Sequence, residues 1–374
     1  MKTLLAGAAL AAVLVWVGGF GSGETTAPYP GAPQPPSRYE VQRAGFGTVD
    51  SREAIGAVVD VQQTGGTTQG AAVPAAVEPA TGADAMPAEV EGTSVDEGQP
   101  GQRAATVDTV VPGPAPWASA PVRTGDAPPP VPAGRAAIAV DEASGTVLYD
   151  QYGHVPLPPA SLTKILTAIV ALENADIDSW AQSDIESTEM AGSSVMGVHR
   201  GEWFTVRDLL YGLMLPSGND AAIVLGRKVA GSDAAFVDMM NQFVANLGLK
   251  ESSYRNPHGL TASGHVSSAY DLAMLSRYAM QNPRFAEIVR TPTWTTSGSR
   301  AFTMGNVNSF LYTYPGADGI KTGFTWAAGP TLVASAVRDG KRVYVVVLNS
   351  QQKDLDAQAI LDWVFANYTW PSEG

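Results

Sequence analysis

Residues 331–348 read Thr331-Leu-Val-Ala-Ser-Ala-Val-Arg-Asp-Gly-Lys-Arg-Val-Tyr-Val-Val-Val-Leu348, and this stretch decides the fold. Two apolar runs, 331–337 and 342–348, flank the polar turn 338–341, which is the pattern of a β-hairpin. A third run, Gly319–Thr325, precedes them and is predicted to be another strand. Because short turns connect antiparallel neighbours, the strands should lie side by side in one antiparallel sheet.

A second hairpin near the start of the apolar part of the chain completes this sheet. Residues 136–140 and 146–149 are predicted strands on either side of the turn 142–145. Residues 354–367 are predicted to form a closing amphipathic helix, with apolar positions at Leu355, Ala359, Leu361, Val364 and Phe365. The sequence therefore predicts an α/β fold. A five-stranded antiparallel sheet, built from both ends of the domain, is flanked by helices, and a helical insert lies between the two hairpins.

The helical insert begins with the string Ser161-Leu-Thr-Lys164. On a helix, residues three apart share one face, so this spacing places an amine within reach of a hydroxyl. The run that follows, to Leu172, is almost entirely apolar and should be buried. Burial and a second nearby cation would lower the pKa of Lys164 toward the range of a general base. The alternative is that Lys164 extends to solvent from the helix end.

Two further strings have the residue types that such a nucleophile needs. Ser217-Gly-Asn219 lies at a helix junction after Pro216 and offers a hydroxyl for proton relay and an amide for orientation. Lys321-Thr-Gly323 lies on the strand 319–325. There Lys321 and Thr322 could hold a carboxylate, and Gly323 would let a substrate backbone approach closely.

Together the three strings are the signature of penicillin-binding proteins and class A β-lactamases. Longer stretches make the resemblance more specific. They include 159–164, 209–222, Asn256-Pro-His-Gly-Leu260 and 316–325. Across 135–368 the chain resembles the serine D-Ala-D-Ala carboxypeptidases, the low-molecular-mass penicillin-binding proteins, which implies a β-lactamase/transpeptidase-like fold with its active site in the helical insert.

The resemblance also implies a mechanism in which Ser161 is acylated by the penultimate D-Ala of a peptidoglycan stem peptide. It implies roles for the other residues: Lys164 as base, Ser217 as proton relay, Asn219 as the group that orients Lys164 and substrate, Lys321 and Thr322 as carboxylate anchor, and the N–H groups of Ser161 and Phe324 as oxyanion hole. β-Lactam antibiotics would be covalent inhibitors. No cofactor and no metal are implied.

Several alternatives stay open at this point. A D,D-endopeptidase that cuts cross-links has the same motifs, and so does a β-lactam sensor or cell-wall binder. A β-lactamase is disfavoured, because Gly218 replaces the Asp of Ser-Asp-Asn and Glu251 is expected to be a solvated charge in a turn. In Asn306-Val-Asn308, Val307 replaces a basic residue of some relatives, which puts a second carboxylate contact in doubt. Trp203 and Tyr211 are expected to pack in the core, and Trp326 could line the cleft.

Composition divides the chain into three zones. Residues 1–20 contain an apolar run after Lys2 and are predicted to be a signal peptide or an N-terminal membrane anchor, which indicates an exported protein at the cell wall. Residues 21–134 are rich in Pro, Gly and Ala and are predicted to be a disordered linker. Residues 135–374 are the predicted catalytic domain, and the resemblance implies that it lacks the β-rich second domain and C-terminal anchor of many relatives.

The remaining composition excludes other classes of protein. The net charge of −13 argues against a nucleic-acid partner, because binding to phosphates needs clustered Lys and Arg. There is no cysteine, which excludes disulfides, thiolate zinc sites and thiol nucleophiles. The four histidines, His154, His199, His258 and His265, have spacings that match no short zinc pattern. They are expected to be structural.

Overall fold

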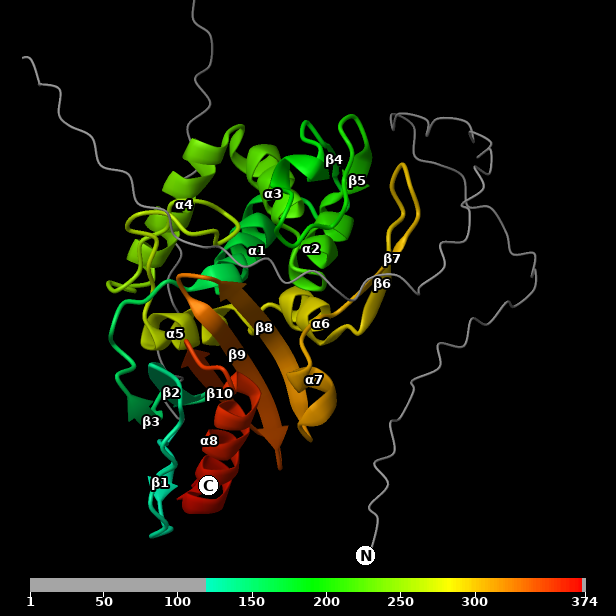
Figure 1. Cartoon of the computed structure of the whole chain (residues 1–374). Coiled ribbons are helices and arrows are strands. Elements are labelled where there is room, and N and C mark those ends of the chain that lie inside the picture. The colour runs from blue at the N-terminus through cyan, green and yellow to red at the C-terminus, as the bar shows by residue number, and fades with distance from the viewer. Residues whose placement is uncertain (1–118, 372–374) are drawn as a thin grey trace, which may run out of the picture. The chain divides into compact units, whose positions relative to one another are not determined.

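The computed structural model describes residues 119–371, and its main element is a five-stranded antiparallel sheet with strand order β3-β2-β10-β9-β8 (Figure 1). The strands are β2 (Ala136–Asp141), β3 (Val147–Gln151), β8 (Ala317–Thr325), β9 (Gly329–Arg338) and β10 (Lys341–Leu348). The two predicted hairpins are β2–β3 and β9–β10, and β10 pairs with β2. The predicted sheet of five antiparallel strands is thus confirmed, with β8 at one edge.

Both faces of this sheet are buried, which explains the unbroken apolar run in β10. Side chains alternate between faces along a strand. Val343, Val345 and Val347 belong to one hydrophobic cluster, whereas Tyr344 and Val346 belong to the other. Because each face is covered, β10 has no polar, solvent-facing alternation and is apolar at nearly every position.

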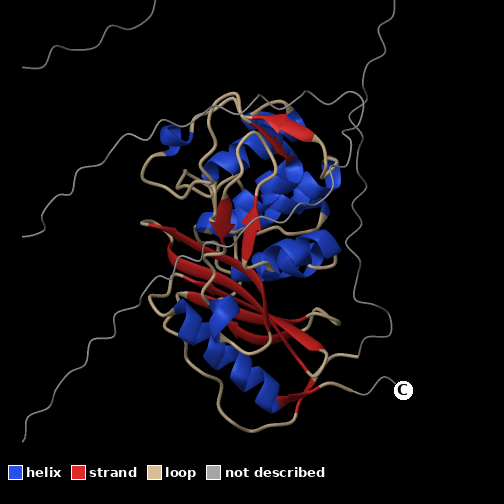
Figure 2. Ribbon diagram, turned by 90° about the vertical axis from the view of Figure 1, so that its right-hand side faces the viewer, coloured by secondary structure: helices blue, strands red, loops and turns tan. Residues whose placement is uncertain are grey.

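Helices cover the two faces unequally (Figure 2). The longer helices are α1 (Thr163–Asn174), α2 (Val206–Met214), α3 (Asn219–Ala230), α4 (Asp233–Asn246), α5 (Ala269–Ala279), α6 (Pro283–Arg290) and α8 (Lys353–Asn367), and α7 (Phe310–Thr313) is a single turn. Helices α1 to α6 belong to the insert on one side, and α8 packs on the opposite face of the sheet. Two 3₁₀ turns, η1 (Ala160–Leu162) and η2 (Ser187–Met190), complete the set.

Within residues 119–371, short strands outside the main sheet join parts of the insert and the two ends of this range. They form three two-stranded antiparallel sheets: β4 (Trp180–Gln182) with β5 (Trp203–Thr205), β6 (Thr293–Thr295) with β7 (Thr303–Gly305), and β1 (Val122–Arg123) with β11 (Tyr368–Thr369).

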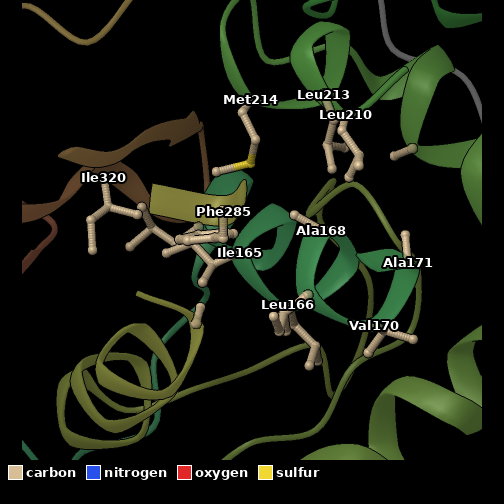
Figure 3. Packing of buried hydrophobic residues seen from close by; sticks show 14 of the residues in the cluster. Ile165, Leu166, Ala168, Val170, Ala171, Leu210, Leu213, Met214, Phe285 and Ile320 are labelled. Atoms are coloured by element: carbon tan, nitrogen blue, oxygen red, sulfur yellow. The ribbon is translucent and has the colours of Figure 1, made fainter. Parts of the chain in front are cut away.

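Helix α1 lies at the centre of the insert and is buried on nearly all sides, as predicted (Figure 3). Its side chains Ile165 and Leu166 are fully buried in the same cluster as Leu213 of α2, Phe285 of α6 and Ile320 of β8. A helix that contacts this many elements is held rigidly. The residues at its N-terminus, Ser161 and Lys164 among them, are positioned by the core rather than by a mobile loop.

The closing helix α8 is present, but part of its predicted apolar face is wrong. Leu361 and Val364 are buried against the sheet, together with Ala357 and Ile360. Leu355 is 63% exposed, and Ala359 is exposed as well. The face that packs follows the spacing 357, 360, 361, 364, and Leu355 and Ala359 fall outside it.

The folded domain begins before the boundary predicted at residue 135. Strand β1 pairs with β11, and the carboxylate of Asp356 accepts hydrogen bonds from the N–H groups of Ala133 and Gly134. These backbone contacts depend on distant residues, so composition alone did not reveal them. The predicted signal or anchor segment 1–20, and the predicted linker up to residue 118, lie outside the described residues. Within 119–371, no helix is both long and apolar enough to cross a membrane.

Candidate active site

Ser161 lies in the 3₁₀ turn η1, immediately before helix α1, so it is at a helix start as predicted. The turn packs against strand β8, and a Cβ on Gly323 would lie 2.9 Å from the backbone nitrogen of Ser161. Any side chain at position 323 would therefore push the nucleophile away from the strand. The sequence prediction attributed this glycine to the approach of substrate, whereas the structure shows that the backbone of Ser161 itself makes the close approach.

Lys164 is fully buried and extends to the nucleophile rather than to solvent. Its Nζ donates hydrogen bonds to Ser161 Oγ at 3.0 Å, to Asn219 Oδ1 at 2.6 Å and to the His258 carbonyl at 2.7 Å. Burial lowers the pKa of Lys164 well below its usual value, the nearby charge of Lys321 lowers it further, and Asp220 partly opposes both. These three bonds use all the protons of the charged form. The neutral amine has two N–H donors and a lone pair, so it can keep its bonds to Asn219 and His258 and accept the proton of the Ser161 hydroxyl.

The second string lies where α2 ends and α3 begins, opposite Lys164. Ser217 is 4% exposed and has a positive φ of 67°, and its Oγ has no hydrogen-bond partner within 119–371. A buried hydroxyl held in strained backbone and left unpaired is a frequent feature of functional sites. Gly218 is required by space, because a Cβ there would lie 2.8 Å from both the Gly212 carbonyl oxygen and the Met196 nitrogen.

The third string forms part of the edge strand β8. Lys321 is 1% exposed, and its Nζ donates a hydrogen bond to the Thr322 carbonyl at 3.0 Å. Burial lowers the pKa of Lys321 to about 7. Thr322 and Phe324 face the same cavity as Ser161. The strand thus presents a hydroxyl and a nearby cation beside the nucleophile.

All eight predicted site residues are brought together around one cavity of about 680 Å³. Six of them line it directly: Ser161, Ser217, Asn219, Thr322, Gly323 and Phe324. The two lysines, Lys164 and Lys321, lie behind this lining and are fully buried. The cavity has room for a peptide of a few residues, with the Ser161 hydroxyl at its wall and the Lys164 amine behind that hydroxyl.

Sequence reasoning missed several residues of this cavity, and two of them, Lys353 and Ser193, bring polar groups to it. Lys353, the first residue of α8, lines it, and its Nζ lies 2.7 Å from Asp354. A cation at a helix N-terminus opposes the helix dipole, and this mismatch was a usable signal. Ser193 also lines the cavity and accepts a hydrogen bond at 2.9 Å from Asn219 Nδ2. Its loop is held by the buried Asp220 carboxylate, which is adjacent to Asn219 in sequence.

The other residues weighed from the sequence lie elsewhere or have packing roles. Glu251 pairs with His154 at 3.0 Å, away from the cavity. Tyr211 is buried and stacks on Trp294 at 3.8 Å. Within the described part of the chain, no group of three or more potential ligands could hold a metal ion. Trp326 lines the cavity, as the sequence suggested it could, and so does Val307.

The proximity of the two lysines leads to a prediction about pH dependence. If Lys164 is the base that takes the proton of Ser161, acylation needs the neutral amine, and the acylation rate should rise with pH through the pKa of Lys164. In a Lys321→Met protein the neighbouring cation is absent and charged Lys164 is less disfavoured, so this pKa rises. The ascending limb of the acylation rate, measured with a fluorescent penicillin, should therefore move to higher pH.

Lys353→Met is the matched control for this experiment, because it removes a cation of the same cavity that is already paired with Asp354. Its ascending limb should stay at the wild-type position. A limb that does not move in Lys321→Met would contradict the electrostatic coupling between the two lysines.

A serine hydroxyl, a buried amine beside it and a cationic strand define the class of serine acyl-transfer enzymes. A family profile described as D-alanyl-D-alanine carboxypeptidase, the S11 peptidases, matches residues 123–352. The chain belongs to this family.

Similar proteins support the assignment. The chain is 37% identical over 260 residues to D-alanyl-D-alanine carboxypeptidase DacB2 of Mycobacterium tuberculosis. The alignment covers 67% of this chain and 89% of that protein. It is 35% identical to DacF of Bacillus subtilis, covering 63% of this chain and 62% of the relative's length. Among solved structures, the Streptomyces K15 DD-transpeptidase matches with a TM-score of 0.61 and 32% identity, over 64% of this chain and all of that one.

Proposed function

We propose that this protein is a serine D-alanyl-D-alanine carboxypeptidase that removes the terminal D-Ala from peptidoglycan stem peptides through an acyl-enzyme on Ser161. The observation that carries the proposal is the buried Lys164, whose Nζ lies 3.0 Å from Ser161 Oγ and whose pKa is lowered. Such an amine has little structural value, because burial of a lysine opposes folding unless the group is neutral or paired. Its arrangement is explained by general-base chemistry.

In the proposed reaction, Ser161 Oγ attacks the carbonyl carbon of the penultimate D-Ala while its proton passes to Lys164 Nζ. The N–H groups of Ser161 and Phe324 stabilise the negative charge that develops on the carbonyl oxygen. The proton then reaches the amine of the leaving D-Ala through Ser217 Oγ, and the peptide C–N bond breaks. Water hydrolyses the ester, with Lys164 again as base, and restores free Ser161.

The preference for a peptide with a free C-terminus rests on Lys321 of β8. A C-terminal carboxylate next to Thr322 would be paired with buried Lys321, which favours a peptide with a free C-terminus. Lys353 also lines the cavity and would supply the second cationic contact that Val307 does not. In a cross-link the residue after the scissile bond is not the C-terminal residue of a linear stem peptide. It places a carboxylate beside Thr322 and Lys321 only if a branch of the cross-link carries one.

A digest of purified peptidoglycan tests the proposal directly. Mass spectrometry should show loss of D-Ala from pentapeptide stems, and diacetyl-Lys-D-Ala-D-Ala should release free D-Ala. Loss of cross-linked dimers without loss of terminal D-Ala would instead make the protein a D,D-endopeptidase. Stable penicillin labelling with neither reaction would make it a β-lactam sensor.

We further propose that residues 1–20 direct export and that the enzyme works at the outer face of the cytoplasmic membrane or in the cell wall. The proposal is supported by the apolar run after Lys2 and by family membership, since the stem peptides lie outside the cytoplasm. Fractionation of cells that express the full chain, compared with a chain lacking residues 1–20, tests it. Retention of both proteins in the cytosol would refute export.

Trp326 is expected to contribute to substrate binding. Its side chain is 95% exposed, lies edge-on to Phe324 with ring centroids 5.5 Å apart, and faces the cavity. In the proposed complex the C-terminal carboxylate lies at Thr322 and the reacting carbonyl lies at the Phe324 N–H. The residue that precedes D-Ala-D-Ala then lies toward Trp326. The methylene groups of a long side chain that lies on the indole should contribute about 0.5–1 kcal/mol through burial of apolar surface.

We therefore expect Trp326→Ala to raise KM for diacetyl-Lys-D-Ala-D-Ala by roughly two- to fivefold, with kcat little changed, because this apolar contact is lost. Tyr152→Ala is the control, because Tyr152 is another exposed aromatic residue and does not line the cavity. A fall in kcat with unchanged KM would argue that Trp326 acts on the chemical step instead.

A further inference from the structure

The peptide group between Ala160 and Ser161 is the feature behind this inference. Its carbonyl oxygen and its N–H belong to one planar unit and point in opposite directions. The nitrogen faces strand β8, because it lies 2.9 Å from where a Cβ on Gly323 would be. Whatever holds the Ala160 carbonyl therefore also sets the direction of the Ser161 N–H, which the proposed reaction uses as an oxyanion donor.

A buried chain of hydrogen bonds ends on this carbonyl. The Arg255 N–H donates to His265 Nδ1 at 3.1 Å, so the ring proton is on Nε2. His265 Nε2 lies 2.8 Å from Thr163 Oγ1, and the Thr163 hydroxyl donates to the Ala160 carbonyl at 2.8 Å. Thr163 is fully buried and His265 is 3% exposed, so water does not compete for these bonds.

The electrostatic surroundings keep this chain in one direction. Burial, with a smaller effect of Arg255, lowers the pKa of His265 to about 4, so the ring is neutral at physiological pH. A neutral ring that accepts at Nδ1 can only donate at Nε2. The Thr163 hydroxyl, which receives that hydrogen bond, is left with its own proton free for the Ala160 carbonyl.

The backbone around the peptide group is tightly constrained as well. Ala160 has a positive φ of 51°, which is unfavourable for a residue with a side chain. On the other side, a Cβ on Gly259 would lie 1.9 Å from the Ala160 carbonyl oxygen. The Thr163 backbone N–H also donates to this oxygen. A strained peptide held on several sides has one orientation in the folded protein.

We propose that Thr163 and His265 are positioning residues for the oxyanion hole: through the Ala160 carbonyl they fix the Ser161 N–H in the direction of the reacting carbonyl. The proposal rests on the acyl-transfer function at Ser161. The proposal gives a role to Thr163, which lies between the serine and the lysine of the string 161–164, and to His265, one of the four histidines. Neither residue lines the active-site cavity.

The test is Thr163→Val, which keeps the shape of the side chain and removes its hydroxyl. Loss of a complete oxyanion donor costs roughly 10²- to 10³-fold in kcat. Here the Ser161 N–H and the Thr163 backbone bond both remain, so we expect kcat for D-Ala release to fall by about tenfold, with KM unchanged. Acylation by a fluorescent penicillin should slow by a similar factor.

Two further variants separate positioning from general stability. Thr163→Ser restores the hydroxyl and should recover most of kcat. Thr296→Val makes the same change at another buried threonine, whose hydroxyl donates to the Arg300 carbonyl at 2.7 Å, and should keep wild-type kcat. Thermal unfolding of each protein shows whether it is folded in the assay.

The histidine is tested by His265→Gln, which keeps a donor, and His265→Phe, which removes it. We expect kcat to fall further in His265→Phe than in His265→Gln, and this pair also serves if Thr163→Val does not fold. The proposal is overturned by a folded Thr163→Val protein with wild-type kcat, or by a Thr163→Ser protein as impaired as Thr163→Val. If wild-type protein releases no D-Ala but is acylated by penicillin, the carboxypeptidase function fails, while acylation rates still test the positioning.

Discussion

The Ser161→Ala protein should release no D-Ala from diacetyl-Lys-D-Ala-D-Ala and should take up no labelled penicillin. The proposed reaction passes through an ester on Ser161 Oγ, and within residues 119–371 no other hydroxyl is hydrogen-bonded to Lys164 Nζ. When the nucleophile of a serine peptidase is removed, kcat falls on the order of 10⁶-fold. Release of D-Ala measured by chromatography, with mass spectrometry of the penicillin adduct, gives both readouts.

A control within the same cavity makes the result specific. Ser194 also lines the cavity, and its carbonyl accepts the Asn219 N–H, but its hydroxyl is not among the hydrogen-bond partners of Lys164 Nζ. Ser194→Ala should therefore keep the penicillin adduct on Ser161. Turnover by a Ser161→Ala protein with a wild-type melting temperature would refute the assignment of the nucleophile.

The parts of the fold that were predictable from the sequence depend on local patterns. The β9–β10 hairpin follows from two apolar runs around one polar turn, and the position of Ser161 at the start of α1 follows from the apolar run after it. Ser161 and Lys164 are three residues apart, so helix geometry alone brings their side chains together. The contact between their side chains was therefore predictable from the sequence, whereas its length of 3.0 Å was not.

Features that depend on distant segments were not predictable in the same way. Lys353 reaches the cavity only because α8 begins where strand β10 ends, close to β9. The exposure of Leu355 depends on how α8 is rotated on the sheet, which its own sequence does not determine. The reason for Gly323 is likewise a contact across the fold, with the backbone of a residue 162 positions earlier.

Motif recognition supplied the grouping of the three strings, which no local pattern could give. Nothing in the sequence around Ser217 predicts that it faces Ser161. The structure adds the physical reason for the grouping: α1 is buried at the centre of the insert, and both the α2–α3 junction and β8 pack against its N-terminal end. The motifs meet because the core places them there.

Replacing Lys164 by Met should remove nearly all acylation while keeping the fold. Methionine has a similar length and is tolerated in apolar surroundings, but it cannot accept a proton. General-base catalysis contributes roughly 10²- to 10⁴-fold, so the penicillin acylation rate should fall within that range. Stopped-flow fluorescence gives the rate, and circular dichroism gives the fold.

Lys164→Arg separates the role of the base from the role of the charge. A guanidinium can donate hydrogen bonds in place of the ammonium, but it stays protonated at every accessible pH and cannot take the proton of Ser161. If Lys164 acts as a base, the Arg and Met proteins should be impaired alike, and both should lose the ascending limb of the pH profile. If Lys164 acts only as a positive charge, Lys164→Arg should retain much of the wild-type rate. That outcome would exclude Lys164 as the general base.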